Sequence, residues 1–240
     1  MYFLLPIRVI VLIYLFAALL PGFFLLRYIY NQDKVEKEDP HLLGSLLLQG
    51  VYAALVSIIL EMIGESVLNV SLSRDSPYYV LVLAFLVVAV VEEGTKFFFL
   101  KRKTWNIPDF NYTFDAIVYA VFVSMGFALF ENVKYVFNYG LTVAFPRAFL
   151  AVPGHMGFAV FMGLFYGKAK KAESMGDEKG KKLYLALAYL VAVFLHGFYD
   201  SCAMKGTTLA TILFVVFVVL MYVIVIRMVK RQSAEDRRIY

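Results

Sequence analysis

Residues 88–96 read VAVVEEGTK and lie inside the apolar run 78–100, YYVLVLAFLVVAVVEEGTKFFFL. A helix of about 20 apolar residues crosses a bilayer, so this run is long enough to span one. It nevertheless contains two adjacent carboxylates, Glu92 and Glu93, and the ammonium of Lys96. A charge at the bilayer centre costs roughly 2.5–3.5 kcal/mol on insertion scales. We therefore expect these three groups to be paired, hydrated or catalytic.

The composition of the whole chain indicates an integral membrane protein. Of its 240 residues, 62% are hydrophobic and 17% are aromatic, which is too apolar for a soluble domain. We predict an all-α, polytopic membrane helix bundle that forms a single domain over residues 1–240, with the first and last spans peripheral to the catalytic ones. Seven runs are long enough to span a membrane: about 5–27, 42–63, 78–100, 114–137, 147–167, 183–204 and 207–228.

The positive charges predict the orientation of these spans. Cytoplasmic loops carry an excess of lysine and arginine. With the N-terminus outside, seventeen of these residues fall on inner segments and five on outer ones, so the sequence favours an N-out, C-in protein in the cytoplasmic membrane. Because the net charge of +5 comes from these short clusters, it indicates topology and not nucleic-acid binding. The single cysteine, Cys202, excludes an intramolecular disulfide framework.

Other predicted spans also carry polar groups. Glu92 and Lys96 are four residues apart, so they can neutralise each other along one helix face, which leaves Glu93 without a partner. Glu61 and Glu65, at the outer end of the second span, are expected to face solvent, with contacts to a substrate gate as the alternative. The remaining intramembrane groups are Glu131 with Asn132 in the fourth span, His155 in the fifth, and His196 with Asp200 in the sixth.

These groups lie at similar depths in the predicted bundle. At about 1.5 Å of rise per residue, His155 lies roughly 12 Å from the outer face, and His196 and Glu131 lie roughly 9 Å from it. Asp200 is four residues after His196, so its carboxylate can orient that imidazole. We expect the groups to converge in the outer half of the membrane, where small residues such as Gly126 and Gly197 permit close helix approach.

Two kinds of chemistry fit this set of residues. His155, His196 and Glu93 can complete a three-ligand site for a divalent metal, zinc first, with an open position for water. In a metal-free alternative, one glutamate is protonated because of burial and its like-charged neighbour and acts as an acid while another group acts as the base. Both arrangements activate water, so hydrolysis of a peptide bond within or beside the membrane is the natural reaction.

The motifs resemble those of a known family. In order and spacing they are similar to the PrsW family of intramembrane proteases, and the similarity covers about residues 20–205, including LLRYIY at 25–30. Related CAAX prenyl endopeptidases of the CPBP group show E-E-x-x-x-R and F-x-x-x-H instead, and here Glu131 stands where that histidine would be. The matching residues are Glu92-Glu93-x-x-Lys96, Phe127-x-x-x-Glu131-Asn132, His155 and His196-x-x-x-Asp200.

The resemblance implies cleavage of a membrane-anchored protein near the outer face of the cytoplasmic membrane, in the founding case an anti-sigma factor. It implies that Glu92 and Glu93 are the water-activating pair and that His155 and His196 are ligands or transition-state stabilisers. Glu131 would be a third carboxylate at the site. Asp200 would orient His196, and Lys96 would be a charge partner. Phe127 and Asn132 would be supporting residues.

Three alternatives remain open from the sequence. The first is a CAAX-type prenyl-protein endopeptidase. The second is a proton- or cation-coupled transporter, since buried glutamate, histidine and aspartate chains also relay protons. The paired broken helices of repeat-built transporters are not evident in the sequence. The third, a non-catalytic membrane scaffold, is disfavoured by the complete motif set.

Overall fold

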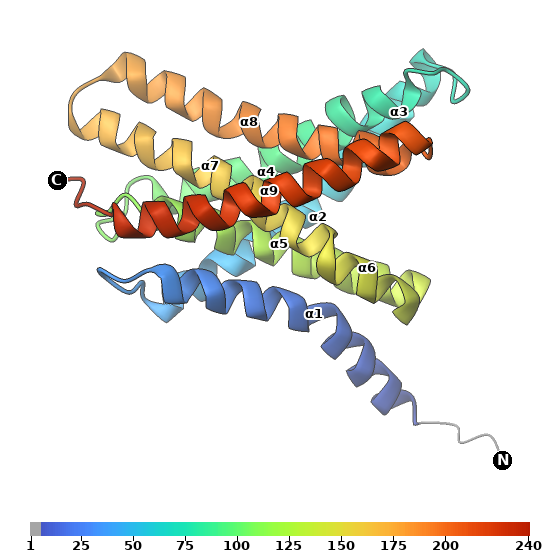
Figure 1. Ribbon diagram of the computed structural model, residues 1–240, viewed down its shortest axis with the longest axis horizontal. Coiled ribbons are helices and arrows are strands. Elements are labelled where there is room, and N and C mark those ends of the chain that lie inside the picture. The colour runs from blue at the N-terminus through green and yellow to red at the C-terminus, as the bar shows by residue number, and fades with distance from the viewer. Residues whose placement is uncertain (1–5) are drawn as a thin grey trace.

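The computed structural model describes residues 6–240, and most of them lie in helices joined by short connections (Figure 1). Within this range there is no strand beyond an isolated bridge between Tyr112 and Arg238. The predicted all-helical class is confirmed, and the predicted start of the first span at residue 5 lies outside the described residues. The long helices are α1 (Ile7–Gln32), α2 (Pro40–Ser71), α5 (Asp115–Tyr139), α7 (Ala151–Ser174), α8 (Glu178–Met204) and α9 (Thr208–Ala234).

Within residues 6–240, six helical segments are long and apolar enough to cross a bilayer. In the fourth of them, Leu141–Ser174, α7 is preceded by η2 (Leu141–Val143) and α6 (Ala144–Phe149). The run 78–100 is divided into α3 (Tyr79–Val82), the π-helix η1 (Leu83–Ala89) and α4 (Val90–Thr104). π-helical turns are rare and often occur at functional sites. Here the π-helix ends three residues before Glu92.

Local sequence signals account for several helix starts. The carboxylate of Asp39 accepts a hydrogen bond from the His41 N–H at 2.9 Å, and Pro40 occupies the first position of α2. Asp177 caps α8 through the N–H of Gly180, and Thr207 caps α9 through the N–H of Ala210. Each of α2, α8 and α9 therefore starts directly after a short connection from the preceding helix. Such short connections make consecutive spans antiparallel.

Helix α5 is the centre of the bundle, and most of its residues are buried. It packs closely on α2, where a Cβ atom at Gly126 would lie 2.0 Å from the carbonyl oxygen of Leu47, so only glycine fits. Helix α7 packs beside it and α8 packs in turn on α7, whereas α1 and α9 lie on the outside and expose much of their apolar surface (Figure 1). This exposed apolar surface is what a lipid environment covers.

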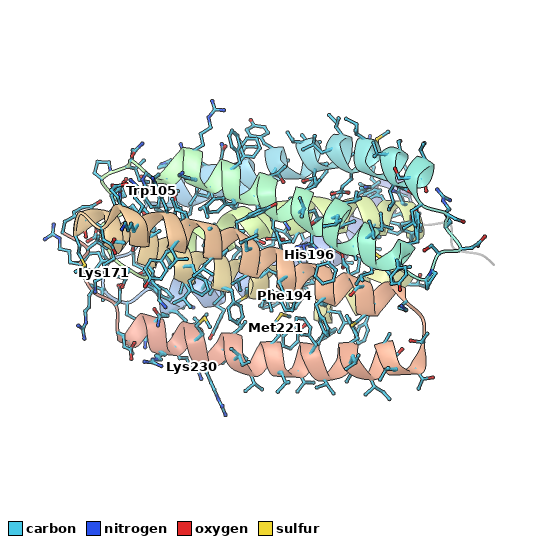
Figure 2. All side chains as sticks on the ribbon, turned by 90° about the horizontal axis from the view of Figure 1, so that it is seen from above. Trp105, Lys171, Phe194, His196, Met221 and Lys230 are labelled. Carbon is cyan, nitrogen blue, oxygen red and sulfur yellow. The ribbon has the colours of Figure 1, made fainter. Side chains whose placement is uncertain are left out.

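The two ends of the bundle differ in charge. One end carries the last turns of α4, α7 and α9, together with the connection between α7 and α8, and we call it the basic end. Its lysines and arginines include Lys171 and Lys230, while His196 lies beyond the middle of the bundle, toward the opposite end (Figure 2). We call the opposite end, where α5 ends and α7 begins, the far end.

Candidate active site

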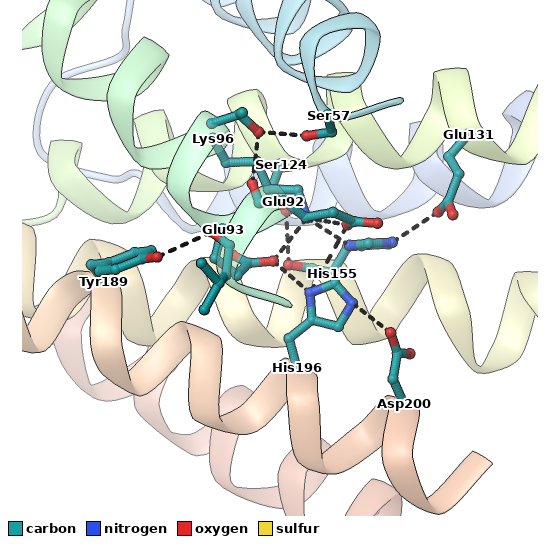
Figure 3. Close-up of polar contacts among 12 residues, drawn as sticks. Ser57, Glu92, Glu93, Lys96, Ser124, Glu131, His155, Tyr189, His196 and Asp200 are labelled. Carbon is teal, nitrogen blue, oxygen red and sulfur yellow. Dashed lines mark hydrogen bonds and ion pairs between the residues drawn. The ribbon is translucent and has the colours of Figure 1, made fainter. Parts of the chain in front are cut away.

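The ammonium of Lys96 is at the centre of the buried polar groups (Figure 3). Its Nζ lies 3.0 Å from Oε2 of Glu92, 2.8 Å from Oε1 of Glu93 and 3.2 Å from Nδ1 of His155. All four residues are at most 5% exposed. The expected pair between Glu92 and Lys96 is present, and the same ammonium also pairs with Glu93. The three costly charges of the run 78–100 thus largely compensate one another.

His196 approaches this cluster from α8. Its Nδ1 lies 2.8 Å from Oε1 of Glu93, and its Nε2 lies 3.3 Å from Oδ2 of Asp200. Both ring nitrogens therefore face carboxylate oxygens, an arrangement complementary to an imidazolium. The close approach depends on Gly197, because a Cβ atom there would lie 2.4 Å from the Phe85 ring of η1.

His155 connects the cluster to α5. Its Nε2 lies 3.1 Å from Oε2 of Glu131. The Lys96 ammonium can only donate hydrogen bonds, so Nδ1 of His155 accepts one from it. The ring hydrogen of the neutral imidazole is then on Nε2, which donates it to Glu131. The two imidazoles lie close together, as the prediction of similar depth requires, with ring centroids 5.5 Å apart.

Glu131 has a second partner in Arg147 of α6. The Arg147 guanidinium donates to Glu131 at 2.9 Å and to Oδ1 of Asn132 at 2.8 Å. The amide nitrogen of Asn132 donates in turn to the carbonyl of Ala18 in α1. Phe127, on the same helix as Glu131, lies under the Lys96 ammonium with its ring centroid 4.0 Å away, a cation–π contact. Phe127 thus contacts Lys96 directly, whereas Asn132 is connected to Glu131 through Arg147.

A small cavity adjoins the cluster between α2, α4 and α5. Its volume is about 20 Å³, and one water molecule needs roughly 10–15 Å³ on the same measure. Carboxylates of Glu92 and Glu131 line it, as does Ser57, whose hydroxyl is hydrogen-bonded to Thr95 at 2.7 Å. Glu61 also lines this cavity and is only partly exposed, whereas Glu65 faces solvent as expected. The cavity is suited to a single water molecule beside Glu92.

The residues fit a divalent metal by their chemistry. Among residues 6–240, one group of potential metal ligands has its donor atoms within 4.8 Å of one another, namely Glu92, Glu93 and His155. Oxygen Oε2 of Glu93 is buried without a hydrogen-bond partner. Two carboxylates and an imidazole are a donor set that zinc accepts. The Lys96 ammonium bonds to all three residues, so a bound cation requires its displacement.

His196 is not in this group of close donors, whereas the other histidine expected to be a ligand, His155, is. His196 is bonded on both nitrogens to carboxylates, and Glu92 takes its place in the group of close donors. The ligand set of His155, His196 and Glu93 therefore stays a prediction beside the set that includes Glu92.

Buried titratable side chains with room for water inside a helical bundle are what a membrane-embedded enzyme requires, although a proton-coupled transporter also has them. The family model described as PrsW family intramembrane metalloprotease matches residues 38–228, and the chain belongs to this family. It is thus a protease of the intramembrane class, and the membership inferred from the motifs is confirmed.

Curated relatives agree with this assignment. The chain is 33% identical over 217 residues to Protease PrsW of Oceanobacillus iheyensis, covering 90% of this chain and 94% of the relative. It is 33% identical over 186 residues to Protease PrsW of Geobacillus kaustophilus, covering 77% and 76%. Protease PrsW of Bacillus subtilis is 32% identical over 184 residues, covering 77% and 79%. No solved structure matches the chain significantly.

Some residues at the site were not anticipated from the sequence. Hydropathy makes Arg147 a charge that sets topology, and the position of Glu61 in its span favours an exposed carboxylate over one that contacts a substrate gate. Ser57 and Thr95, which form a buried hydroxyl pair next to Glu92, carry no distinguishing motif. The π-helix η1 follows from no residue pattern in the apolar run. A polar residue on the inner face of α2 was the only available signal for Ser57.

Proposed function

We propose that this protease hydrolyses a peptide bond of a membrane-anchored protein at the buried cluster of Glu92, Glu93, Lys96, His155 and His196. One observation carries the proposal: side chains from three helices converge in the bundle interior beside a cavity large enough for one water molecule. Peptide hydrolysis inside a membrane needs such a place, because lipid excludes the water that the reaction consumes.

Glu92 is the residue best placed to act as the base. It lines the water-sized cavity, whereas Oε1 of Glu93 is engaged by both Lys96 and His196. Glu92 would remove a proton from a water molecule while the water oxygen attacks the carbonyl carbon of the substrate. His196, held between Glu93 and Asp200, would deliver a proton to the leaving nitrogen. Lys96 offers a positive charge for the oxyanion that develops.

A metal can supply part of this chemistry. When bound, zinc polarises a carbonyl and lowers the pKa of water, and Glu92, Glu93 and His155 are the residues that would hold it. The alternative set of His155, His196 and Glu93 and a metal-free glutamate mechanism remain as competing proposals. In each of them Asp200 orients His196, and Arg147 with Glu131 orients His155.

The position of the site suggests where the substrate is cut. His196 lies eight residues before the end of α8 at Met204, and Glu131 lies eight residues before the end of α5 at Tyr139. Both are therefore roughly 12 Å from the far end. We propose that the basic end faces the cytoplasm, with the N-terminus outside, so cleavage takes place near the outer face of the cytoplasmic membrane. An anti-sigma-factor-like protein with one span is the first substrate to test.

The decisive experiment is cleavage of single-span, membrane-anchored reporters by the purified protein in liposomes. Glu92→Gln, Glu93→Gln and His196→Ala should each lower the rate at least about 100-fold. The matched control is Glu65→Gln, which makes the same chemical change at an exposed glutamate. Undiminished cleavage by Glu92→Gln and His196→Ala would refute the proposed site.

Metal content separates the two ligand sets. Zinc measured by elemental analysis in protein purified without chelator should fall in His155→Ala under either set. In His196→Ala it should persist if Glu92, Glu93 and His155 are the ligands, and it should fall if His196 is a ligand. Equal zinc in the wild type and His155→Ala would argue against both.

A further inference from the structure

A pair of adjoining cavities lies at the basic end, far from the buried cluster. Their volumes are about 390 and 570 Å³, and they are formed by α7, α9 and the residues that follow α9. Both cavities are lined by Leu164 and Lys168 of α7 and by Gln232 and Glu235 of α9 and its end. We call them together the basic pocket, after the cations that line it: Lys168, Lys171, Arg227, Arg231 and Arg237.

Most of these cations have no acidic partner. Glu235 is the acidic residue of the lining, and its carboxylate pairs with Arg231 at 2.9 Å. Throughout residues 6–240, no carboxylate lies within 4.0 Å of Lys171, Arg227 or Arg237. The pocket therefore has a large positive excess that an anionic ligand would neutralise.

The wall that carries Arg237 is fixed in place. The carbonyl of Arg237 accepts the N–H of Thr113 at 3.0 Å, and the N–H of Ile239 donates to the carbonyl of Asn111 at 2.7 Å. The neighbouring Asp236 accepts from the hydroxyl of Thr113 and from the N–H of Phe114, so its carboxylate is already engaged. The segment after α9 thus closes one side of the pocket as a tethered strap.

The pocket is amphipathic. Leu164, Ile224 and Met228 supply apolar walls next to the cations, and Ile224 is continuous with the exposed apolar face of α9. The cations begin where the apolar run of α9 ends, at the level where a spanning helix leaves the hydrocarbon. A ligand that fits must carry a negative group at this level and an alkyl chain along α9.

We propose that the basic pocket binds the head group of an anionic phospholipid, with its acyl chain along α9. Basic pockets between membrane helices on the cytoplasmic side are suited to phosphate-bearing head groups. The alternative source of the same chemistry is a soluble phosphate. It would use the cations and leave the apolar walls unoccupied, so a lipid accounts for more of the pocket.

The test is lipid binding by the purified, delipidated protein in neutral detergent. Phosphatidylglycerol, phosphatidylcholine and inorganic phosphate are titrated, and the thermal midpoint and native mass spectra report binding. The pocket variant carries Lys168→Gln, Lys171→Gln and Arg237→Gln. The control variant carries Arg102→Gln, Lys179→Gln and Lys182→Gln, which removes the same charge from exposed positions at the same end.

We expect phosphatidylglycerol to stabilise the wild type and the control variant, while phosphatidylcholine and inorganic phosphate do not. Its affinity should fall at least about tenfold in the pocket variant. Equal loss in both variants would overturn the proposal in favour of diffuse surface charge. Equal stabilisation by phosphatidylcholine would remove the head-group specificity, and saturation by inorganic phosphate would identify a soluble ligand.

Folding of the pocket variant is checked by circular dichroism. If it fails to fold, the single variants Lys168→Gln and Lys171→Gln carry the same test, since both side chains are exposed. Each should weaken phosphatidylglycerol binding about fivefold, and Lys179→Gln should not. Unchanged affinity in both single variants would refute the pocket as the binding site.

Discussion

The Nζ atom of Lys96 lies 3.2 Å from Nδ1 of His155 and also hydrogen-bonds the carboxylates of Glu92 and Glu93. The three residues whose donor atoms could hold a metal are therefore the three acceptors of one ammonium. A cation and the ammonium compete for the same electron pairs. Lys96 would then act as a charge that holds the ligands together until a metal or a substrate displaces it.

This competition predicts that Lys96→Gln binds zinc more tightly than the wild type does. Removing the ammonium removes the repulsion against a second cation and frees all three acceptors. We expect the zinc affinity to rise at least about tenfold, which corresponds to about 1.4 kcal/mol. Isothermal titration in detergent measures it, with Lys101→Gln at the exposed basic end as the control. Zinc affinity equal to that of the wild type would show that Lys96 does not occupy the metal position.

The bond between Arg147 and Glu131 predicts a second effect on activity. Arg147→Gln leaves Glu131 with His155 as its partner, so His155 is less well held and the partly buried carboxylate loses about 1–3 kcal/mol of stabilisation. We expect cleavage to fall about 10- to 100-fold. Arg147→Lys should be intermediate, because it keeps the charge but cannot donate to both Glu131 and Asn132 from a planar fork.

The control for this pair is Arg74→Gln. Arg74 is an exposed arginine that also pairs with a glutamate, Glu65, at 3.5 Å. Exposed ion pairs contribute little, so both the rate and the stability should stay near those of the wild type. A similar loss in the two glutamine variants would mean that Arg147 acts only through general charge.

The helix topology could be predicted because hydropathy and spacing determine it. Apolar runs of about 20 residues identify the spans, and depth along a helix follows from a constant rise. These two facts placed His155 and His196 at one level, and their rings are 5.5 Å apart. The pairing of Glu92 with Lys96 followed in the same way from their spacing along one helix.

Contacts between helices could not be predicted in the same way. Arg147 reaches Glu131 because the short helix α6 turns its side chain into the bundle, and hydropathy alone made it an outer loop charge. Glu61 lines the cavity because α2 presents that face to α4 and α5. The π-helix η1 packs against α8, where Phe85 meets Gly197. Each of these three features depends on which faces of two helices pack together. The residue pattern of a single helix does not determine this.

The contact of Gly197 with Phe85 predicts that Gly197→Ala impairs the protease. The new Cβ would lie 2.4 Å from the Phe85 ring, so the ring, α8 or η1 must shift, and a shift of α8 would move His196 away from Glu93. We expect at least about a tenfold loss of cleavage. The double variant Gly197→Ala with Phe85→Ala should recover most of it, because the ring that clashes is gone.

Gly94→Ala is the control for this prediction. It makes the same change beside Glu93, but its Cβ would meet Tyr189 at 3.5 Å, an ordinary contact. Its rate should be close to that of the wild type. If the double variant is no better than Gly197→Ala alone, the glycine is needed for a reason other than the approach of Phe85.

The buried carboxyl of Glu38, in the connection between α1 and α2, predicts a pH dependence of stability. Burial raises the pKa of Glu38 from its ordinary value of 4.5 to about 7, and the charge of Asp33 acts in the same direction. The folded protein therefore holds this proton more tightly than the unfolded chain does. The stabilisation is full below pH 4.5 and is lost as the pH rises through 7.

Glu38→Gln keeps a group that can accept the Tyr119 hydroxyl, which donates to Glu38 at 2.9 Å, and it cannot ionise. Its thermal midpoint should match that of the wild type near pH 5 and exceed it near pH 8, by roughly 2–4 °C for each kcal/mol removed. Differential scanning fluorimetry at the two pH values measures this. Glu36→Gln, an exposed neighbour, should show no such difference. A midpoint of Glu38→Gln that follows the wild type at pH 8 would mean that Glu38 ionises there without cost, with its charge stabilised by the Tyr119 hydroxyl.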